Sequence, residues 1–329
     1  DLKTLIFIQI LLFSQAILLG IAYHFHWLTP SILIGLSLLL GILGAIDTPL
    51  RQSLLSLIIE EKTALPNALA LNAMVFNASR FVGPPIAGLL LATIGAELCF
   101  YLNGLSYLIL AIAVLCMKQV KSSIAQGNMK NVLKEGFEYV YQHSVFKYLM
   151  LTVFVLNMTA SSYVALLPVY AKDILLGDEK TLGILWGAAG IGSLLSSMLL
   201  AGQKNFNRVH AQILLNILFC GAGLLLLALS SSYMLLMLAM FLLGFGISTS
   251  NISTNIILQQ DAPESLRGRV VSIYTSTRFG FDALGGLCAG LLASLIAPQN
   301  VMLIFALILL AYALFNWLQI YPRIKKAPH

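Results

Sequence analysis

The stretch GPPIAGLLL, from Gly83 to Leu91, recurs loosely as GGLCAGLLA from Gly285 to Ala293. A polar loop precedes each copy: EEKTALPNAL lies before the first and PESLRGRVV before the second. Parallel repeats of this kind arise when two halves of a membrane protein are related by an axis along the membrane normal. The repeat therefore predicts two structurally related halves.

Both copies lie in a chain with the composition of a membrane protein. Of its 329 residues, 59% are hydrophobic and 10% are charged, whereas a soluble domain carries roughly a quarter charged residues. The mean hydropathy is +0.90. Apolar runs recur from end to end, and each is long enough to cross about 30 Å of hydrocarbon as a helix. The alternating strands of a membrane barrel are absent from the sequence, which predicts an all-α integral membrane protein.

Ten membrane spans are expected, and they leave no room for a soluble catalytic domain. Their approximate bounds are 4–24, 30–50, 67–94, 97–117, 146–171, 181–203, 211–230, 233–257, 270–296 and 300–321. The four cysteines, Cys99, Cys116, Cys220 and Cys288, all fall inside spans, where a thiol behaves as a small hydrophobe. Neither a disulfide framework nor a metal site is indicated, and no cofactor is expected.

The net charge of +6 is explained by topology rather than by nucleic-acid binding. If the amino end is inside, the inner loops and termini take 15 of the 19 Lys and Arg residues. The outer side takes Lys172 and Lys180, and Arg80 and Arg278 lie within spans. The positive-inside rule then predicts that both termini lie in the cytoplasm. The expected location of the protein is the bacterial inner membrane.

A polar interval divides the chain into an N-terminal bundle (1–118), a cytoplasmic linker (119–145) and a C-terminal bundle (146–329). The second part of the linker, NVLKEGFEYVYQ, predicts a surface helix along the cytoplasmic face of the membrane, because one helical face carries Val132, Leu133, Phe137, Val140 and Tyr141. A charged linker without that role is the alternative. The C-terminal bundle has six spans and the N-terminal bundle has four, so the first two of twelve helices are expected to be missing before Asp1.

Five motifs, in order, resemble the major facilitator superfamily, in its branch of enterobactin-exporter-like transmembrane secretion effectors. They are DTPLRQSLLSLI, LPNALALNAMVFNASRFVGPPIAG followed by CFYLNGLSYL, LKEGFEYV, LPVYAKDILLG and LRGRVVSIY. The resemblance covers nearly the whole chain. It implies a fold of two pseudo-symmetric helical bundles that rock about a central site, and proton-coupled export of a small molecule.

The repeated stretch is similar to a fifth-helix motif of proton-coupled exporters, in which glycines and a Gly-Pro pair let helices pack closely and bend. Prolines cannot donate backbone hydrogen bonds, so a kink is expected at Pro84 and Pro85. The alternative is a proline-kinked packing helix without a gating role. The gating or packing positions are Gly83, Pro84, Pro85, Gly88, Gly285, Gly286 and Gly290.

Charged residues inside spans are the first candidates for transport roles. Arg80 is expected to face a cavity, a counter-charge or backbone carbonyls. Asp47, close to the cytoplasmic end of its span, is the candidate proton carrier. Its alternative roles are a helix-end cap or a structural partner of Arg51, four residues later.

In the second half, Arg278 and Asp282 lie four residues apart, and they either serve the substrate or neutralise each other. A polar cavity that suits an anionic or mixed-polarity molecule, such as a siderophore or a drug, is predicted. Its candidate residues are Arg80, Asn77, Asn157, Tyr163, Arg278 and Asp282. Asparagines inside spans have a second interpretation, since their amides also join helices by hydrogen bonds.

The sequence does not support an enzymatic function, because it contains no GxxxxGK[ST], no HExxH and no nucleophile elbow.

The predicted partners are a small-molecule substrate, protons and the lipid bilayer, and a monomer is expected. Two other functions are considered. A scaffold that kept the fold and lost transport is favoured if the gene begins near Asp1, and a membrane-embedded enzyme would need clusters of intramembrane His, Asp or Glu.

Overall fold

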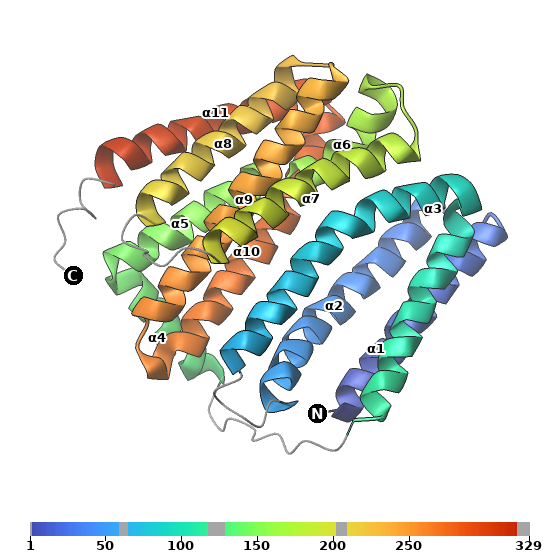
Figure 1. Cartoon of the computed structure of the whole chain (residues 1–329), viewed down its shortest axis with the longest axis horizontal. Helices are drawn as coiled ribbons and strands as arrows, with labels where there is room; N and C mark the ends of the chain where they lie inside the picture. The colour runs from blue at the N-terminus through green and yellow to red at the C-terminus, as the bar shows by residue number, and fades with distance from the viewer. Residues whose placement is uncertain (1, 59–64, 118–128, 202–208, 321–329) are drawn as a thin grey trace. The chain divides into compact units, whose positions relative to one another are not determined.

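The structure, a computed structural model, describes residues 2–58, 65–117, 129–201 and 209–320. Within those ranges the ordered elements are all helices (Figure 1). They are α1 (Leu2–His24), α2 (Pro30–Ile58), α3 (Leu65–Leu115), α4 (Met129–Gln142), α5 (Ser144–Thr159), α6 (Tyr163–Val169), the π-helical turn η1 (Tyr170–Ile174), α7 (Glu179–Ala201), α8 (Val209–Leu229), α9 (Tyr233–Asp261), α10 (Glu264–Ala293), α11 (Pro298–Phe315) and the π-helical turn η2 (Asn316–Ile320).

Eight of the expected spans coincide with helices that are long and apolar enough to cross a membrane, among the described residues. The span expected at 270–296 is helical in α10 as far as Ala293, but Arg278 and Asp282 interrupt its apolar run. The span expected at 67–94 is helical within α3, and most of its side chains lie outside the described residues. The chain is a multi-pass membrane protein of all-α class.

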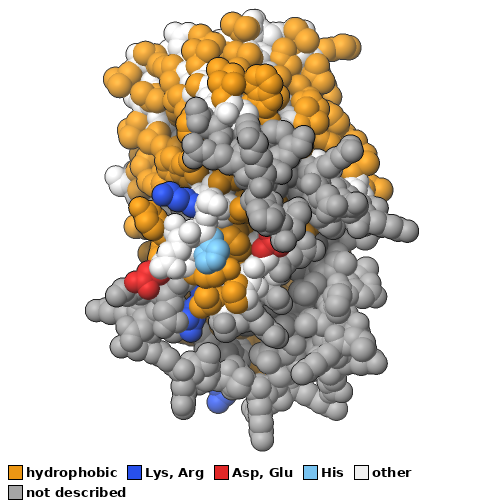
Figure 2. All heavy atoms as spheres, turned by 90° about the vertical axis from the view of Figure 1, so that its left-hand side faces the viewer, with side chains coloured by type: hydrophobic (Ala, Val, Ile, Leu, Met, Phe, Trp, Pro, Cys, Tyr) orange, Lys and Arg blue, Asp and Glu red, His pale blue; other side chains and the backbone are white. Residues whose placement is uncertain are grey.

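Charged and apolar side chains separate on the face shown in Figure 2. Hydrophobic side chains cover its upper part, and the described charged side chains and a histidine lie lower. A helix bundle that crosses a bilayer needs this division, because charged groups stay near water and apolar groups face hydrocarbon.

Gly95 separates the two spans that α3 contains. Its backbone has φ 81° and ψ 169°, a conformation that side-chain-bearing residues rarely adopt. The chain reverses there, as expected from the boundary between spans 67–94 and 97–117. The backbone stays helical through Pro84 and Pro85, and the kink expected at these prolines remains a prediction.

The chain divides into two compact units. One comprises residues 1–75 and 87–125, and the other comprises residues 76–86 and 126–329. In the first unit, α1 packs against α2 around Ile8, Leu12 and Leu43. The predicted division into bundles with a linker at 119–145 remains a prediction.

In the second unit, α9 is the central helix and packs closely against α7 and α8 (Figure 1). Glycines allow this approach. A β carbon at Gly244 would lie 1.9 Å from the carbonyl oxygen of Ala189 on α7, and one at Gly192 would lie 2.2 Å from that of Phe241 on α9. Small residues at such contacts bring backbones together, which is how helices associate in lipid.

The span expected at 146–171 lies within the candidate span Ser144–Ile174, and its backbone hydrogen bonding is irregular between α5 and α6. Between α5 and α6 the Ser161 amide reaches back to the Leu156 carbonyl, and the amides of Val164 and Ala165 bond only three residues back. After Pro168, which has no amide hydrogen, the chain continues as the π-helical turn η1. The span expected at 146–171 is confirmed within Ser144–Ile174, but average hydropathy carries no information about this local change of hydrogen bonding.

Candidate functional site

Asp47 is buried in the first unit, with 2% of its surface exposed. The side-chain amide of Gln9 on α1 donates to its Oδ1, and the guanidinium of Arg51, one turn later on α2, pairs with its Oδ2. Arg51 is about half exposed, so the ion pair connects a buried carboxylate to the surface. The partner role that was the alternative for Asp47 is therefore present, and it leaves a proton-carrier role open.

Gln9 was not among the sequence candidates. Its side chain is fully buried, and its Oε1 has no hydrogen-bond partner among the described residues. A buried amide with one unused acceptor is unfavourable unless water or a rearranged neighbour satisfies it. The polar character of position 9 within an apolar helix was the available signal.

The second unit contains a pair of facing amides. Asn157 on α5 and Asn251 on α9 exchange hydrogen bonds, with Nδ2 to Oδ1 distances of 3.3 and 3.4 Å. The hydroxyl of Ser161, in the break between α5 and α6, donates to the Oδ1 of Asn157 at 3.3 Å. All three side chains are buried. Asn157 therefore joins helices, as in the second interpretation given for span asparagines, and it does so at the helix break.

Tyr274 extends this network to α10. Its hydroxyl donates to the backbone carbonyl of Asn251 at 2.8 Å, and Arg278 follows one turn later on α10, close enough to interact electrostatically with Tyr274. Arg278 is half-buried, and its guanidinium carbon also lies 5.1 Å from the centroid of the Phe279 ring. Hydrogen bonds thus join Tyr274, Asn251, Asn157 and Ser161, and Arg278 lies one turn beyond Tyr274 at the end of this polar chain.

The other site residues that the sequence predicted in the second unit lie near this series of polar side chains. Asp282 is half-buried one turn beyond Arg278, and Tyr163 is buried next to Trp186, with ring centroids 6.1 Å apart. Gly285 packs against the backbone of α5 beside Asn157, since a β carbon there would lie 2.4 Å from the carbonyl oxygen of Met158. A β carbon at Gly286 would make an ordinary contact at 3.7 Å, and one at Gly290 would meet no atom within 4 Å.

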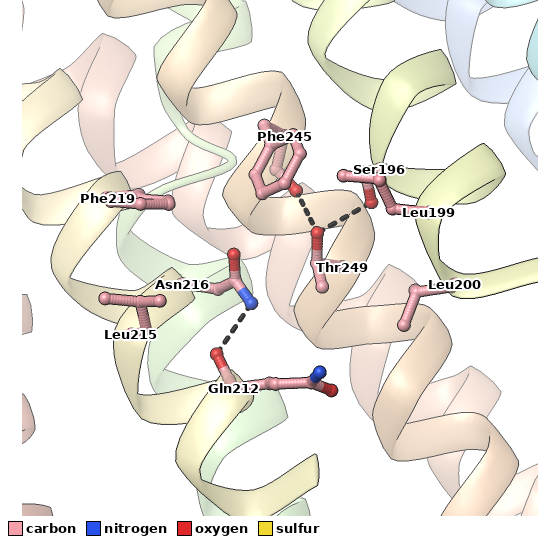
Figure 3. A pocket seen from close by; sticks show the side chains of 9 residues that line it. All are labelled: Ser196, Leu199, Leu200, Gln212, Leu215, Asn216, Phe219, Phe245 and Thr249. Atoms are coloured by element: carbon pink, nitrogen blue, oxygen red, sulfur yellow. Dashed lines mark hydrogen bonds between the residues drawn. The ribbon is translucent and has the colours of Figure 1, made fainter. Parts of the chain in front are cut away.

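Further hydroxyls join α9 to α7. Ser193 and Ser248 lie 2.5 Å apart, and Ser196 donates to Thr249 at 2.7 Å. Thr249 in turn donates to the carbonyl of Phe245, and these residues border a pocket of about 200 Å³ between α7, α8 and α9 (Figure 3). Its lining is mostly apolar, and its polar groups are largely bonded to the surrounding helices, so it is a weaker candidate than the Arg278 network.

Several candidates on α3 have side chains outside the described residues. They are Asn77, Arg80, Pro84, Pro85 and Gly88. Gly83 is described and exposed. The structure thus brings together Asn157 and Arg278 from the predicted set and adds Ser161 and Tyr274. Tyr274 is the last residue of the motif LRGRVVSIY, and this motif was the available sequence signal for it.

The amino-acid sequence is similar to those of several named membrane transporters. A staphyloferrin A transporter of Staphylococcus aureus is 27% identical over 84% of this chain and 70% of its own length. The multidrug efflux pump Tap of Mycolicibacterium fortuitum is 28% identical over 70% of this chain and 57% of its own length. A PmrA homolog of Lactococcus lactis, a multidrug resistance efflux pump, is 25% identical over 72% of this chain and 59% of its own length. The chain thus spans less than two thirds of the two multidrug pumps.

Solved structures show the same fold. A bacterial homolog of the human lysosomal transporter Spinster, inward-facing and unoccupied, superposes with a TM-score of 0.64 at 14% identity, over 96% of this chain and 82% of its own. The nucleoside transporter NupG gives a TM-score of 0.62 at 15% identity, over 98% of this chain and 84% of its own. The family model described as transmembrane secretion effector matches residues 2–328. The chain therefore belongs to the transmembrane secretion effectors of the major facilitator superfamily.

Proposed function

We propose that this protein exports a small molecule from the cytoplasm in exchange for protons, through alternating access of its two halves. The family and the fold are those of membrane transporters. Relatives named as a siderophore transporter and as multidrug efflux pumps support export and suggest the class of substrate. In this proposal both termini lie in the cytoplasm and the protein acts as a monomer.

The polar chain from Arg278 to Ser161 carries the proposal. A charged guanidinium group is energetically unfavourable in the hydrocarbon of a membrane. Arginines inside membrane segments are therefore found mostly where they face water, a partner or a ligand. Arg278 lies one turn after Tyr274, whose hydroxyl bonds to Asn251, and Asn251 bonds to Asn157 beside the irregular turn between α5 and α6. Discontinuous helices near the membrane midplane form the binding sites of many secondary transporters.

The chemistry of Arg278 favours an anionic or mixed-polarity substrate. A guanidinium presents parallel N–H donors that match a carboxylate in a bidentate arrangement. Asp282, one turn further along α10, would accept hydrogen bonds from amine or hydroxyl groups of the same molecule. A carboxylate siderophore or an amphipathic drug offers both kinds of group. In this proposal Asn77, Arg80 and Tyr163 contribute to the same cavity.

Asp47 is proposed as the proton carrier in the first half. Its carboxylate is buried and bound by Gln9 and Arg51. Protonation would remove the charge that holds Arg51, and Arg51 is already half exposed. The ion pair would therefore break when a proton binds, which is the kind of local electrostatic change that shifts a two-state transporter.

Uptake by everted membrane vesicles tests the function. Vesicles from cells that express the full-length gene are given carboxylate siderophores and drugs, with and without an acid-inside pH gradient. We expect at least one compound to accumulate above vector controls only when the gradient is present. Arg278→Lys keeps the charge but loses the planar fork, so accumulation should fall by about tenfold at equal expression.

The matched control is Lys172→Arg, a Lys/Arg exchange at an exposed position outside the network. It should leave uptake unchanged. If no compound accumulates with full-length protein present in the membrane, the transport proposal is wrong and the scaffold alternative gains support. If Arg278→Lys and Lys172→Arg behave alike, Arg278 has no role in substrate recognition.

A further inference from the structure

The helix α4 lies where the chain enters the membrane. It ends at Gln142, and after His143 the candidate span Ser144–Ile174 begins. The His143 ring nitrogen Nδ1 lies 2.9 Å from the carbonyl of Tyr139, and the rings of Tyr139, His143 and Phe146 form one cluster across the junction. Because one residue separates α4 from a spanning helix, the C-terminal turn of α4 must lie at the depth of the lipid headgroups.

One side of α4 is fixed to α10. Gly136 is buried, and a β carbon there would lie 3.0 Å from Cδ1 of Ile273 and 3.1 Å from Cβ of Arg269. Val140, one turn later, is 8% exposed. Ile273 directly precedes Tyr274, so α4 supports α10 next to the polar chain that ends at Arg278.

A second side of α4 carries two exposed aromatic residues, with exposed Glu138 between them in sequence. Phe137 is 58% exposed and Tyr141 is 72% exposed, and they lie one turn apart. The ammonium of Lys147, in the first turn of α5, lies 4.3 Å from the centroid of the Tyr141 ring. We call Phe137, Tyr141 and Lys147 the α4 outer edge.

We propose that the α4 outer edge binds anionic phospholipid, with Phe137 and Tyr141 in the interfacial layer and Lys147 at the headgroup phosphate. Aromatic rings and lysines at a span boundary are the residues that membrane interfaces favour. An amphipathic helix in that plane binds through its apolar area and its attraction to anionic lipid. Bound lipid would hold α4 in place and, through Gly136, would fix the position of α10.

The partner is a lipid surface rather than a protein because of where the edge lies. Tyr141 lies three residues and Phe137 seven residues before Ser144, where the candidate span begins, so both are expected near the headgroup layer. A soluble partner would have to displace lipid to reach Tyr141. The Lys147 ammonium lies next to the Tyr141 ring, and a basic side chain at a membrane surface strengthens binding to anionic lipid.

Photocrosslinking in nanodiscs tests the proposal without reference to transport. Full-length protein is reconstituted in phosphatidylcholine with phosphatidylglycerol that carries a diazirine in its headgroup, and adducts are located by mass spectrometry. We expect adducts within residues 137–147. Lys147→Gln should lower their yield by about fivefold, the factor expected for one basic residue at an anionic surface. Phe137→Ser with Tyr141→Ser should lower it further.

Tyr233→Ser is the matched control, because Tyr233 is a partly exposed aromatic residue at the start of another spanning helix. It should leave the 137–147 adducts unchanged. If Lys147→Gln labels like the wild type, or if a diazirine phosphatidylcholine labels the edge equally well, recognition of anionic lipid is overturned. Absence of adducts in 137–147 also overturns it. If the double serine variant does not fold, Lys147→Gln alone decides the question.

Discussion

Replacing Gly285 with alanine probes the contact between α10 and α5. The added methyl carbon would lie 2.4 Å from the carbonyl oxygen of Met158 and 2.9 Å from its carbonyl carbon. Backbone atoms cannot rotate away, so the two helices must separate by on the order of 1 Å. Met158 directly follows Asn157, and the separation would therefore also stretch the network between Asn157 and Tyr274.

The magnitude follows from two opposing effects. Overpacking of this kind costs about 1–3 kcal/mol. Alanine favours helix over glycine by up to about 1 kcal/mol. Gly290→Ala has only the second effect, since nothing lies within 4 Å of its β carbon. The two variants should therefore differ by about 1–3 kcal/mol, with Gly285→Ala the less stable.

Thermal unfolding of purified protein, followed with a thiol-reactive dye, measures this difference. Cys220 is fully buried in the second unit and becomes reactive only when the helices separate. At roughly 2–4 °C per kcal/mol, Gly285→Ala should unfold several degrees below Gly290→Ala. Gly286→Ala, with its ordinary contact, should behave like Gly290→Ala. Equal midpoints for Gly285→Ala and Gly290→Ala would refute the close approach of α10 to α5.

Three further predictions concern the first half and the topology. Asp47→Asn keeps an acceptor for Gln9 but removes the titratable charge, so export should lose its response to the pH gradient, and export that stays pH-driven removes Asp47 from coupling. Arg80→Lys should insert and express normally yet export poorly, whereas lower expression with normal transport per molecule would indicate a structural role. Externally added thiol reagent should label a cysteine placed at Asp178 and not one at Ser122, and the opposite pattern would contradict the cytoplasmic placement of the linker.

The sequence predicted the helices well because hydropathy and charge act over about 20 residues at a time. The spans, the reversal near Gly95 and the amphipathic helix at Met129–Gln142 are all properties of such windows. The break between α5 and α6 escaped detection, because it depends on which carbonyl each amide reaches. Pro168 was the local signal for irregular backbone in that span.

The candidate site was predicted in part. The sequence proposed Arg278 and Asn157 because polar groups in a membrane carry an energetic penalty, and their roles in transport remain predictions. It did not identify Tyr274, because this hydroxyl donates to a backbone carbonyl, and every residue offers such an acceptor. Gln9 and Asp47 lie far apart in sequence on different helices, so their contact follows only from how α1 packs on α2. The pseudo-symmetric correspondence of 67–94 with 270–296 remains a prediction.

The most direct test of proton-coupled export is the response of a pH gradient to the substrate. Everted vesicles that contain the full-length protein are acidified inside, and the gradient is followed with a pH-sensitive dye. The account predicts that an exported substrate, when added, partly dissipates the gradient as it accumulates, and that the same substrate has no effect in vesicles carrying Asp47→Asn. A substrate that accumulates while the gradient stays unchanged would contradict proton-coupled export.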